Sequence, residues 1–484
     1  MRWADAVRAR SAMTTDGVSK AAMWAALPDE WPDDLTALIR QRLADRGDRL
    51  VVLDDDPTGA QTVHDVPVLT EWDVETLAEE LARSPVFYIL TNSRSLSDED
   101  AVALAREIGG RLAQAAERSG RSYVVASRSD STLRGHYPAE VEALEEAVGG
   151  EFDGVIFAPF FEEGGRFTID DVHYVQQGER LTRASETEFA RDARFGYRHD
   201  NLREFIEEKT GGRVRAREVV SISLADVRRG GPTVVAEKLA LVRDGGVAIV
   251  NAASYRDLAV VVAGLLAAEA SGKRFLYRCA ASFVRARGGI TARPLLGSDE
   301  LAQSTNAGGL LVVGSHVGKT TEQLEEALRV LDLRPLELDV DAVVEAEERR
   351  AEVERIGLEV NAELERGGDV ALFTGRTFVD RDDASAAAAL ASGISEALSA
   401  IVRGLSVRPR FLVAKGGTTA SEIATAGLGV RRAMVLGQIL PGVPVWQLGA
   451  ETRFPEMPYV VFPGNVGEAD SVAECVSLLG GRLR

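Results

Sequence analysis

Residues 49–63 read Arg-Leu-Val-Val-Leu-Asp-Asp-Asp-Pro-Thr-Gly-Ala-Gln-Thr-Val, so a short apolar run ends at three carboxylates. Residues 50–53 are branched and precede turn-forming residues, which predicts a buried strand. Ligands of open α/β sheets bind at the carboxyl ends of strands, and the proline and Gly59 can bend the chain so that residues 54–56 and Thr58 face one crevice. Adjacent acids repel one another and favour a cation, a polyhydroxyl ligand or a shared proton. The stretch predicts a ligand site, with a solvated acidic turn as the alternative.

The composition is ordinary for a globular enzyme, and 484 residues predict about two or three domains. The net charge of −19 argues against a nucleic-acid partner, because phosphates attract basic surfaces. Two distant cysteines, Cys279 and Cys475, argue against a disulfide framework or a cysteine-rich zinc site. No apolar run approaches the roughly 20 residues of a membrane span, and residues 1–20 lack an apolar signal region. We therefore expect a cytoplasmic protein with no membrane partner.

Strand, polar loop and helix alternate through the first half of the chain. Predicted strands at 86–90, 123–126 and 154–160 each run into a loop with hydroxyl, carboxylate or guanidinium groups. This alternation predicts an α/β fold with a mostly parallel sheet, whose polar loops gather at one edge. The candidate substrate-binding residues are Thr58, Gly59, Arg94, Asp130, Ser131, Arg134 and Arg166.

Residues 171–202 show little periodicity and are interpreted as a loop-rich lobe near the site. His173 and His199 lie in this segment. Neither has a partner at a diagnostic spacing, so a structural role is the favoured interpretation for both.

Glycine-rich loops follow several predicted strands of the second half. The strand at 309–313 leads into Gly-Ser-His-Val-Gly-Lys-Thr-Thr at 314–321, which is one residue short of a P-loop signature. Further glycine loops follow the strands near 411–414 and 460–462. Such loops together indicate one cradle for nucleotide phosphates, because backbone N–H groups can approach an anion there. The candidate nucleotide-binding residues are Ser315, Gly416, Gly417, Thr418, Thr419, Gly442 and Asn465.

A composition change near residue 300 predicts a domain boundary. We expect an N-terminal helical extension at 1–47, a substrate-binding domain at 48–300 and a nucleotide-binding domain at 301–484. Both domains are predicted to be α/β with mostly parallel sheets, with the active site in the cleft between them.

An acidic, arginine-lined crevice and a phosphate cradle fit phosphoryl transfer from a nucleotide to a small polyhydroxy acid. Guanidinium groups match carboxylates, so the three arginines of the crevice could clamp the acid. Asp55 and Asp56 are the candidate catalytic residues, because one of them, or Asp130, could take the proton from the attacking hydroxyl. Mg²⁺ is expected to neutralise charge on the phosphoryl group, and the metal ligands stay unassigned.

Six stretches together resemble the four-carbon acid sugar kinase family. They are Asp-Asp-Asp-Pro-Thr-Gly-Ala at 54–60, Asp-Ser-Thr-Leu-Arg-Gly at 130–135, Gly-Gly-Arg at 164–166, Gly-Ser at 314–315, Gly-Gly-Thr-Thr at 416–419 and Pro-Gly-Val-Pro at 441–444. The resemblance implies ATP-dependent phosphorylation of threonate, erythronate or an oxo-tetronate at a terminal hydroxyl. By the same resemblance Asp55, Asp56, Asp130 and Arg134 would lie on the substrate side, and Ser315, Gly416 to Thr419 and Gly442 would contact ATP.

The chain departs from the family pattern at three places. Pro57 stands where the family commonly has Phe, and Arg128-Ser129 stands where it has Lys-Ile. Thr418 stands where the family has Glu, which removes a carboxylate from the nucleotide loop.

Two other functions fit parts of the sequence. Asp54-x-Asp56-x-Thr58 after a strand also fits a haloacid-dehalogenase-like phosphatase, in which Asp54 is the nucleophile and Asp56 an acid/base. A non-catalytic sensor of sugar acid or nucleotide would keep the fold without turnover. The expected partners are a sugar acid and ATP, and a homodimer is an open alternative to a monomer.

Overall fold

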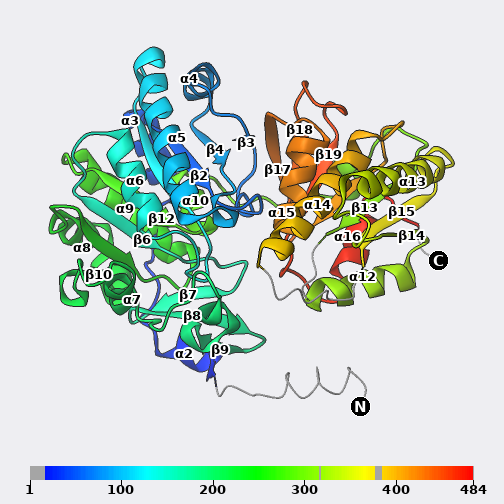
Figure 1. The fold of residues 1–484 in the computed structure, drawn as a ribbon. Coiled ribbons are helices and arrows are strands. Elements are labelled where there is room, and N and C mark those ends of the chain that lie inside the picture. Colours follow the sequence, from blue (N-terminus) through cyan, green and yellow to red (C-terminus); the bar gives the residue numbers. More distant parts are fainter. Residues whose placement is uncertain (1–16, 315–317, 376–383, 483–484) are drawn as a thin grey trace. The chain divides into compact units, whose positions relative to one another are not determined.

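The computed structural model describes residues 17–314, 318–375 and 384–482 (Figure 1). By packing they fall into two compact units. The first unit comprises the described parts of Met1–Gly47 and Val124–Gly289, and the second comprises those of Asp48–Tyr123 and Ile290–Arg484. The second unit therefore draws on both halves of the chain.

The first unit contains parallel strands in the order β10-β11-β6-β12-β5. The pairs are parallel because a helix or long connection returns the chain between strands. The strands are β5 (Tyr123–Arg128), β6 (Gly154–Ala158), β10 (Val220–Ile222), β11 (Gly246–Val250) and β12 (Phe275–Cys279). The helices are α2 (Lys20–Ala26), α3 (Thr36–Arg46), α6 (Ala139–Val148), α7 (Leu202–Lys209), α8 (Gly231–Ala240), α9 (Tyr255–Ala270) and α10 (Ala281–Arg287).

A separate antiparallel sheet in this unit has the order β1-β9-β8-β7. Its strands are β1 (Val18–Ser19), β7 (Arg166–Ile169), β8 (Val172–Gln177) and β9 (Arg180–Arg183). The interpretation of residues 171–202 as loops is wrong for β8 and β9. These strands are short and bounded by arginines and glutamines, which conceals their period-two pattern, and β1 forms where β9 offers an edge.

The strands of the second unit follow the order β2-β4-β3-β17-β18-β19-β16-β13-β15-β14. Strands β2, β4 and β3 are parallel, as are β19, β16, β13, β15 and β14. Between the two sets, β17 runs antiparallel to both β3 and β18. The strands are β2 (Arg49–Asp54), β3 (Val66–Leu69), β4 (Val86–Leu90), β13 (Leu310–Val313), β14 (Leu333–Leu338), β15 (Asp369–Thr374), β16 (Leu412–Lys415), β17 (Arg432–Leu440), β18 (Val443–Leu448) and β19 (Pro458–Phe462).

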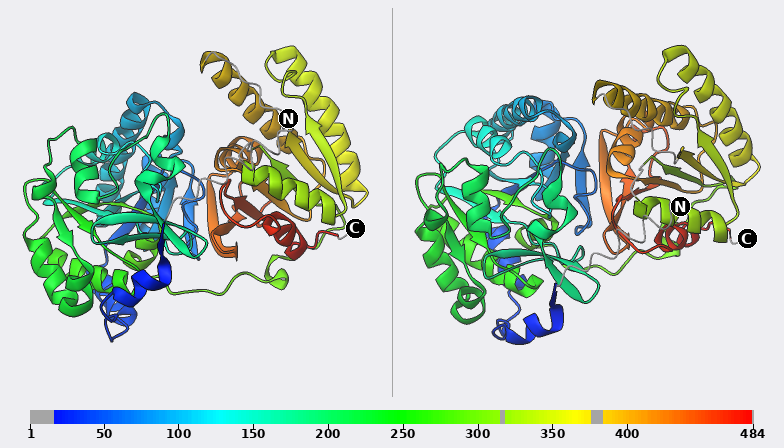
Figure 2. Two further views of the ribbon diagram at one scale, coloured as in Figure 1. Left: turned by 90° about the horizontal axis from the view of Figure 1, so that it is seen from below. Right: turned by 60° about the horizontal axis from the view of Figure 1, so that its bottom comes forward.

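Helices cover both faces of the parallel strands β19, β16, β13, β15 and β14. Helices α13 and α14 lie on one face, and α12 and α16 lie on the other (Figure 2). Val313, Leu324, Phe462 and Val476 belong to the buried cluster between these strands and α12 and α16. The helices of the second unit are α4 (Val74–Arg83), α5 (Asp98–Ser119), α11 (Ser298–Leu301), α12 (Gly318–Val330), α13 (Ala346–Glu365), α14 (Ala384–Arg403), α15 (Gly417–Glu422) and α16 (Ser471–Leu478).

The β3–β17 pair brings residues 66–69 beside the second half of the chain, with Val68 opposite Ala433. Arg432 at the start of β17 donates from Nε to the buried carboxylate of Glu80, at 2.8 Å from Oε2. Strand pairing and this ion pair both fasten residues 48–123 into the second unit.

Two α/β units with mostly parallel strand pairs confirm the predicted fold class. The placement of the active site in a cleft between two domains stays a prediction. No helix within the described ranges has both the length and the apolar character that crossing a membrane requires.

Candidate active site

Asp54 ends strand β2, and its carboxylate is buried against the turn that follows. A Cβ atom on Gly59 would lie 2.0 Å from Asp54 Oδ2, so only glycine fits at that position. The turn closes through a hydrogen bond from the N–H of Gly59 to the carbonyl of Asp56, at 3.0 Å. The predicted bend is present, and it encloses Asp54.

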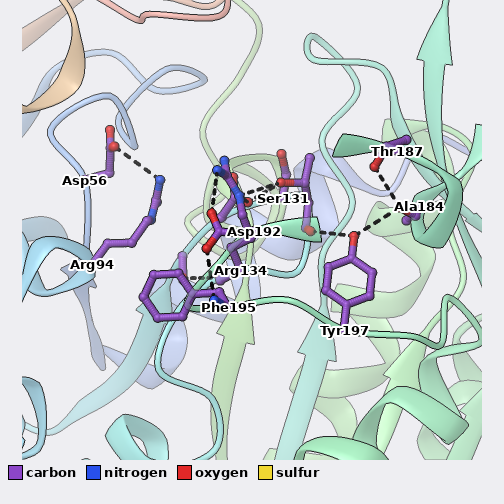
Figure 3. Close-up of polar contacts among 12 residues, drawn as sticks. Asp56, Arg94, Ser131, Arg134, Ala184, Thr187, Asp192, Phe195 and Tyr197 are labelled. Atoms are coloured by element: carbon purple, nitrogen blue, oxygen red, sulfur yellow. Dashed lines mark hydrogen bonds and ion pairs between the residues drawn. The ribbon is translucent and has the colours of Figure 1, made fainter. Parts of the chain in front are cut away.

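Arg94 joins the two acids that follow Asp54. Its Nε donates to Asp55 Oδ2 at 3.1 Å, and its Nη2 donates to Asp55 Oδ1 at 2.5 Å. Its Nη1 donates to Asp56 Oδ2 at 3.2 Å, a contact that Figure 3 shows. Arg94 stands in the 3-10 turn Ser93–Ser95 after β4, and β4 is the parallel neighbour of β2. The loops after these two strands therefore meet at one sheet edge.

The two acids differ in exposure. The Asp55 side chain is 2% exposed, whereas that of Asp56 is 22% exposed. Asp56 Oδ1 also accepts hydrogen bonds from the hydroxyl of Thr58 and from its N–H, the latter at 2.8 Å. Asp56 is thus the acid that a bound molecule reaches more easily.

A pocket of about 190 Å³ opens beside these acids within the second unit. On its other side stands the loop after β16, where a Cβ on Gly417 would lie 3.0 Å from Asp56 Oδ2. The Nδ2 atom of Asn92 donates to the hydroxyl of Ser421 and links the two sides. The lining residues are Asp55, Asp56, Pro57, Asn92, Arg94, Ser95, Thr418, Ser421 and Glu422. Predicted substrate and nucleotide loops therefore share one pocket.

In the first unit, the loop after β5 carries another charged cluster (Figure 3). Arg134 Nε donates to Asp130 Oδ2 at 2.8 Å, and Arg134 Nη1 lies 3.5 Å from Asp192 Oδ2. The hydroxyl of Thr132 also donates to Asp130. Burial opposes ionisation of Asp192, but two backbone N–H groups and the charge of Arg134 lower its pKa overall. Ser131 is buried, and its carbonyl accepts a hydrogen bond from His173.

Arg166, the first residue of β7, lies near the same aromatic ring as Arg134. The Cζ atoms of Arg134 and Arg166 are 5.0 and 5.9 Å from the centroid of the Phe189 ring. Arg166 Nη1 donates to the carbonyl of Gly164, whereas its buried Nε has no hydrogen-bond partner within the described residues. Burial lowers the pKa of Arg166; Asp130 opposes that change, and Arg134 adds to it. An anion placed here would stabilise both guanidinium groups.

The glycine loops of the second unit meet around the end of β16. Gly416 has φ = 114°, a conformation that favours glycine, and it turns the chain from β16 into α15. A Cβ on Gly314, after β13, would lie 2.3 Å from Thr419 Oγ1, so these two loops touch. Gly442, with φ = 78°, forms the β17–β18 turn, and a Cβ there would lie 3.2 Å from the side chain of Val466. Ser315 lies outside the described residues.

The loop after β19, residues 463–468, contains Asn465 and is held through its carbonyl groups. Lys415 donates from Nζ to carbonyl 463, and Thr320 donates to carbonyl 464 at 3.1 Å. Gln323 Nε2 donates to carbonyls 466 and 468, at 3.0 and 2.8 Å. Burial, with the charge of Lys319, lowers the pKa of Lys415 to about 7.

Within the described ranges, no three histidine, cysteine or acidic side chains form a metal-binding group. The pocket nevertheless offers oxygen donors from Asp56, Thr418, Ser421 and Glu422. Mg²⁺ commonly binds one or two protein carboxylates together with phosphate oxygens and water. The donor set fits a Mg²⁺ ion that arrives with a nucleotide.

Several residues of these clusters are not among the candidates predicted from the sequence. Asn92, Ser421 and Glu422 line the pocket, and Phe189 lies beside the two guanidinium groups. Glu422 follows Thr418 by four residues, so helical spacing was the available signal for it. Nothing in the sequence links Phe189 to Arg134, because that contact depends on how the 3-10 helix Glu188–Arg191 folds back.

Models of two known domains match most of the chain. Residues 50–287 match a sugar-binding N-terminal domain, and residues 310–472 match a nucleotide-binding C-terminal domain. The chain is 25% identical over 458 residues to a D-erythronate kinase of Heliobacterium modesticaldum (strain ATCC 51547 / Ice1), covering 89% of this chain and 97% of the relative.

Two solved structures share the fold. A Haemophilus influenzae protein matched by the family model DUF1537 has a TM-score of 0.58 at 20% identity, over 89% of this chain and all of the other. A protein of Salmonella typhimurium LT2, described as a putative tRNA synthase, has a TM-score of 0.62 at 15% identity, over 88% of this chain and 98% of the other.

Proposed function

The chain belongs to the four-carbon acid sugar kinase family and is a sugar-acid kinase, and from this premise we propose that it transfers the terminal phosphoryl group of ATP to a terminal hydroxyl of a four-carbon sugar acid. Erythronate, threonate and an oxo-tetronate are the candidate acceptors. The D-erythronate kinase named above makes D-erythronate the first to test.

The observation that carries the proposal is the pocket that gathers Asp55, Asp56 and Arg94 beside Thr418 and Ser421. Phosphoryl transfer needs an acceptor and a phosphoryl donor in line, and catalysis is then largely positioning and electrostatics. In this pocket the acidic loop after β2 could hold the acceptor, and the hydroxyl-bearing loop after β16 could hold the phosphoryl donor next to it.

We assign the role of general base to Asp56. It is the more exposed acid of the pair, and its Oδ1 is oriented by Thr58. A carboxylate at hydrogen-bond distance from the acceptor hydroxyl can take its proton as the new P–O bond forms. Asp55 is assigned to orienting Arg94, and Gly59 to the turn that presents both acids.

We assign recognition of the acid to the loop after β5. Arg134 and Arg166 would bind the carboxylate of the substrate, because their paired guanidinium groups lie by the Phe189 ring and the buried Nε of Arg166 is unpartnered among the described residues. Asp130 would accept hydrogen bonds from sugar hydroxyls, and Ser131 would shape the loop between them. Guanidinium–carboxylate pairing of this kind favours an acid over a neutral sugar.

We assign the ATP phosphates to the glycine loops. Gly417, Thr418 and Thr419 would contribute backbone N–H and hydroxyl groups, and Gly416 would form the turn that presents them. Gly442 and Asn465 would border the same loops. Ser315 is retained as a candidate on the family resemblance. The assignment agrees with the span of the nucleotide-binding domain model, residues 310–472.

We propose that Mg²⁺ accompanies ATP and is held by Glu422 together with phosphate oxygens and water. The bound ion would neutralise charge on the triphosphate. By function, an extension at 1–47, a sugar-acid domain at 48–300 and a nucleotide domain at 301–484 are also proposed, in keeping with the two domain models. By packing, residues 48–123 belong with the second unit.

The burial of Asp54 against Gly59 does not favour a phosphatase, whose nucleophile must reach its substrate. A non-catalytic sensor is separated from a kinase by turnover alone, which the experiment below measures.

The proposal is tested by ADP formation from Mg²⁺-ATP with D- and L-threonate, D- and L-erythronate and their oxo forms. One acid should raise ADP release well above background, and Asp56→Asn and Arg134→Ala should each abolish that increase. Asp244→Asn, at an exposed side chain distant in sequence from both loops, is the matched control and should retain activity. Failure of every acid to raise ADP release would refute the assignment of a four-carbon substrate.

A further inference from the structure

The loop that carries Asp130 and Arg134 is held by three side chains from outside it. They donate to the backbone carbonyls of Ser131, Thr132 and Arg134. The donors are His173 Nε2 at 2.7 Å, Tyr197 Oη at 2.9 Å and Arg278 Nη2 at 3.1 Å. These donors come from β8, from the segment before α7 and from β12, so three separate elements fix one short loop.

His173 is a buried side chain whose two ring nitrogens have different partners. It is the cross-strand neighbour of Thr168 in the β7–β8 hairpin, and the Thr168 hydroxyl lies 3.0 Å from His173 Nδ1. The carbonyl of Ser131 can only accept, so Nε2 carries the proton and Nδ1 accepts from Thr168. Burial lowers the pKa of His173 to about 4, so the ring is neutral near pH 7 and these two partners fix its tautomer.

Tyr197 acts on the next residue of the loop. Its hydroxyl lies 2.9 Å from the carbonyl of Thr132 and 3.3 Å from that of Ala184. Figure 3 shows the contact of Tyr197 with Ala184. The ring packs edge-on against Phe205 at 5.5 Å. The hydroxyl is therefore held in place by packing that does not involve the loop.

The loop backbone needs such support. Leu133 is buried and has φ = 70°, and Gly135 has φ = 119°. A left-handed conformation at a non-glycine residue costs on the order of 1–3 kcal/mol and persists only where the surroundings hold it. Between residues 131 and 134 the carbonyls that accept side-chain hydrogen bonds flank Leu133 on both sides.

We propose that His173 and Tyr197 are positioning residues of the sugar-acid site. By holding the carbonyls of residues 131 and 132, they keep Asp130, Thr132 and Arg134 in the hydrogen-bonded arrangement that receives the acid. They act through the loop and do not touch the substrate. This inference rests on the proposed sugar-acid kinase activity.

The test compares Tyr197→Phe and His173→Leu, which each remove one donor, with His173→Gln, whose amide restores a donor. Tyr174→Phe is the matched control, because Tyr174 lies on the same strand and its side chain makes no hydrogen bond with the described residues. Each variant is assayed for the KM of D-erythronate, the KM of ATP and the hydrogen–deuterium exchange of amides 131–135.

Loss of one donor should raise the KM for D-erythronate about tenfold and leave the KM for ATP within about twofold, because roughly one hydrogen bond is lost from the acid site. Exchange at amides 131–135 should accelerate in the same two variants and not in the control. His173→Gln should recover most of the KM. Tyr197→Phe keeps the buried ring and remains informative if His173→Leu does not fold.

Unchanged exchange at amides 131–135 in both donor-removing variants would overturn the inference, as would an equal rise in the KM for ATP. If the unaltered protein turns over none of the four-carbon acids, the substrate proposal fails. The exchange of the loop then decides the inference by itself.

Discussion

Arg94 donates to both carboxylate oxygens of Asp55, from Nε at 3.1 Å and from Nη2 at 2.5 Å. Two parallel hydrogen bonds fix the guanidinium group in a plane, which a lysine cannot reproduce. Asp55 is almost fully buried, and Arg94 is a charged partner of its carboxylate.

Replacing Arg94 by methionine should destabilise the protein by about 3 kcal/mol, because it removes the guanidinium group that pairs with a buried carboxylate. Urea unfolding of Arg94→Met and of the double variant Arg94→Met/Asp55→Asn measures this, and the double variant should regain most of the loss. Arg118→Met removes an exposed ion pair with Glu75 and should change stability by no more than about 0.5 kcal/mol. Equal losses in the single and double variants would contradict the pairing.

Substituting Gly59 by alanine should displace the acid loop, since the added Cβ would meet the Asp54 carboxylate at 2.0 Å. We expect a loss of about 1–3 kcal/mol and a lower kcat. Gly110→Ala is the control, because Gly110 lies in α5 and an added Cβ there would meet nothing within 4 Å. That variant should be neutral or stabilised by up to about 1 kcal/mol. A Gly59→Ala protein of unaltered stability would show that the turn can relax.

His173 predicts a decline in stability at mildly acidic pH. Burial lowers its pKa to about 4; the Ser131 carbonyl, Asp130 and Asp200 oppose this change, and Arg166 adds to it. Between pH 4 and the usual value of about 6.5 the unfolded chain binds a proton that the folded chain does not, so stability falls as pH falls through this window. The loss contributed by His173 should reach about 3 kcal/mol. The free energy of unfolding, measured in urea at pH 7.5, 6 and 5, should fall more steeply with decreasing pH for the unaltered protein than for His173→Gln. An equal fall in both proteins would refute the prediction.

Replacing Lys415 is expected to raise the stability of the protein and to weaken nucleotide binding. Its pKa is lowered to about 7, so the folded chain holds one proton fewer than the unfolded chain between pH 7 and about 10.5, and stability rises with pH across that range. Lys415→Met should therefore stabilise the protein by about 2 kcal/mol at pH 6.5, give no gain at pH 10, and weaken ATP binding because loop 463–468 loses an anchor.

Lys319→Met is the control for this substitution. Lys319 is exposed and donates to the carbonyl of Gly467 in the same loop, at 3.0 Å. Lys319→Met should weaken ATP binding and stabilise the protein by less than Lys415→Met does, because repulsion from Lys319 is a smaller cause of the lowered pKa of Lys415 than burial. Both effects are measured by thermal unfolding and by ATP titration, and equal gains from the two variants would refute the burial argument.

Replacing Glu422 is expected to change the Mg²⁺ requirement of the reaction. Glu422→Gln should raise the Mg²⁺ concentration for half-maximal ADP formation about fivefold, because one of the few carboxylates in the pocket is lost. Activity should recover at high Mg²⁺, and the KM for the sugar acid should change little. Glu474→Gln, in α16, is the control. An unaltered Mg²⁺ requirement would remove Glu422 from the metal site.

The sequence predicted the parallel strands well, because residues 50–53 and 310–313 are apolar runs that end at turn residues. It did not predict the antiparallel pieces. Strand β8 alternates in burial, but its half-buried positions include Tyr174 and Gln176, which resemble a polar loop in composition. Strand β1 has only two residues and depends on β9 for its hydrogen bonds.

The strand ends in the sequence predicted which loops form the site, but not which side chains of those loops contact one another. That Asp55 and Asp56 follow a strand was visible in the sequence. That Arg94 engages both depends on β2 and β4 being adjacent, and that Asn92 meets Ser421 depends on a contact between residues 329 positions apart. Such pairings follow from strand order, which local patterns do not encode.

The β3–β17 ladder has a consequence for dissecting the chain. Residues 290–484 expressed alone would leave β17 without its neighbour on one side, and an uncovered strand of nine residues invites association with other copies. Glu80, the buried partner of Arg432, would be missing as well. A protein fragment that begins at the boundary between the two domain models would therefore tend to aggregate. A nucleotide-binding fragment that folds on its own would have to include residues 48–123.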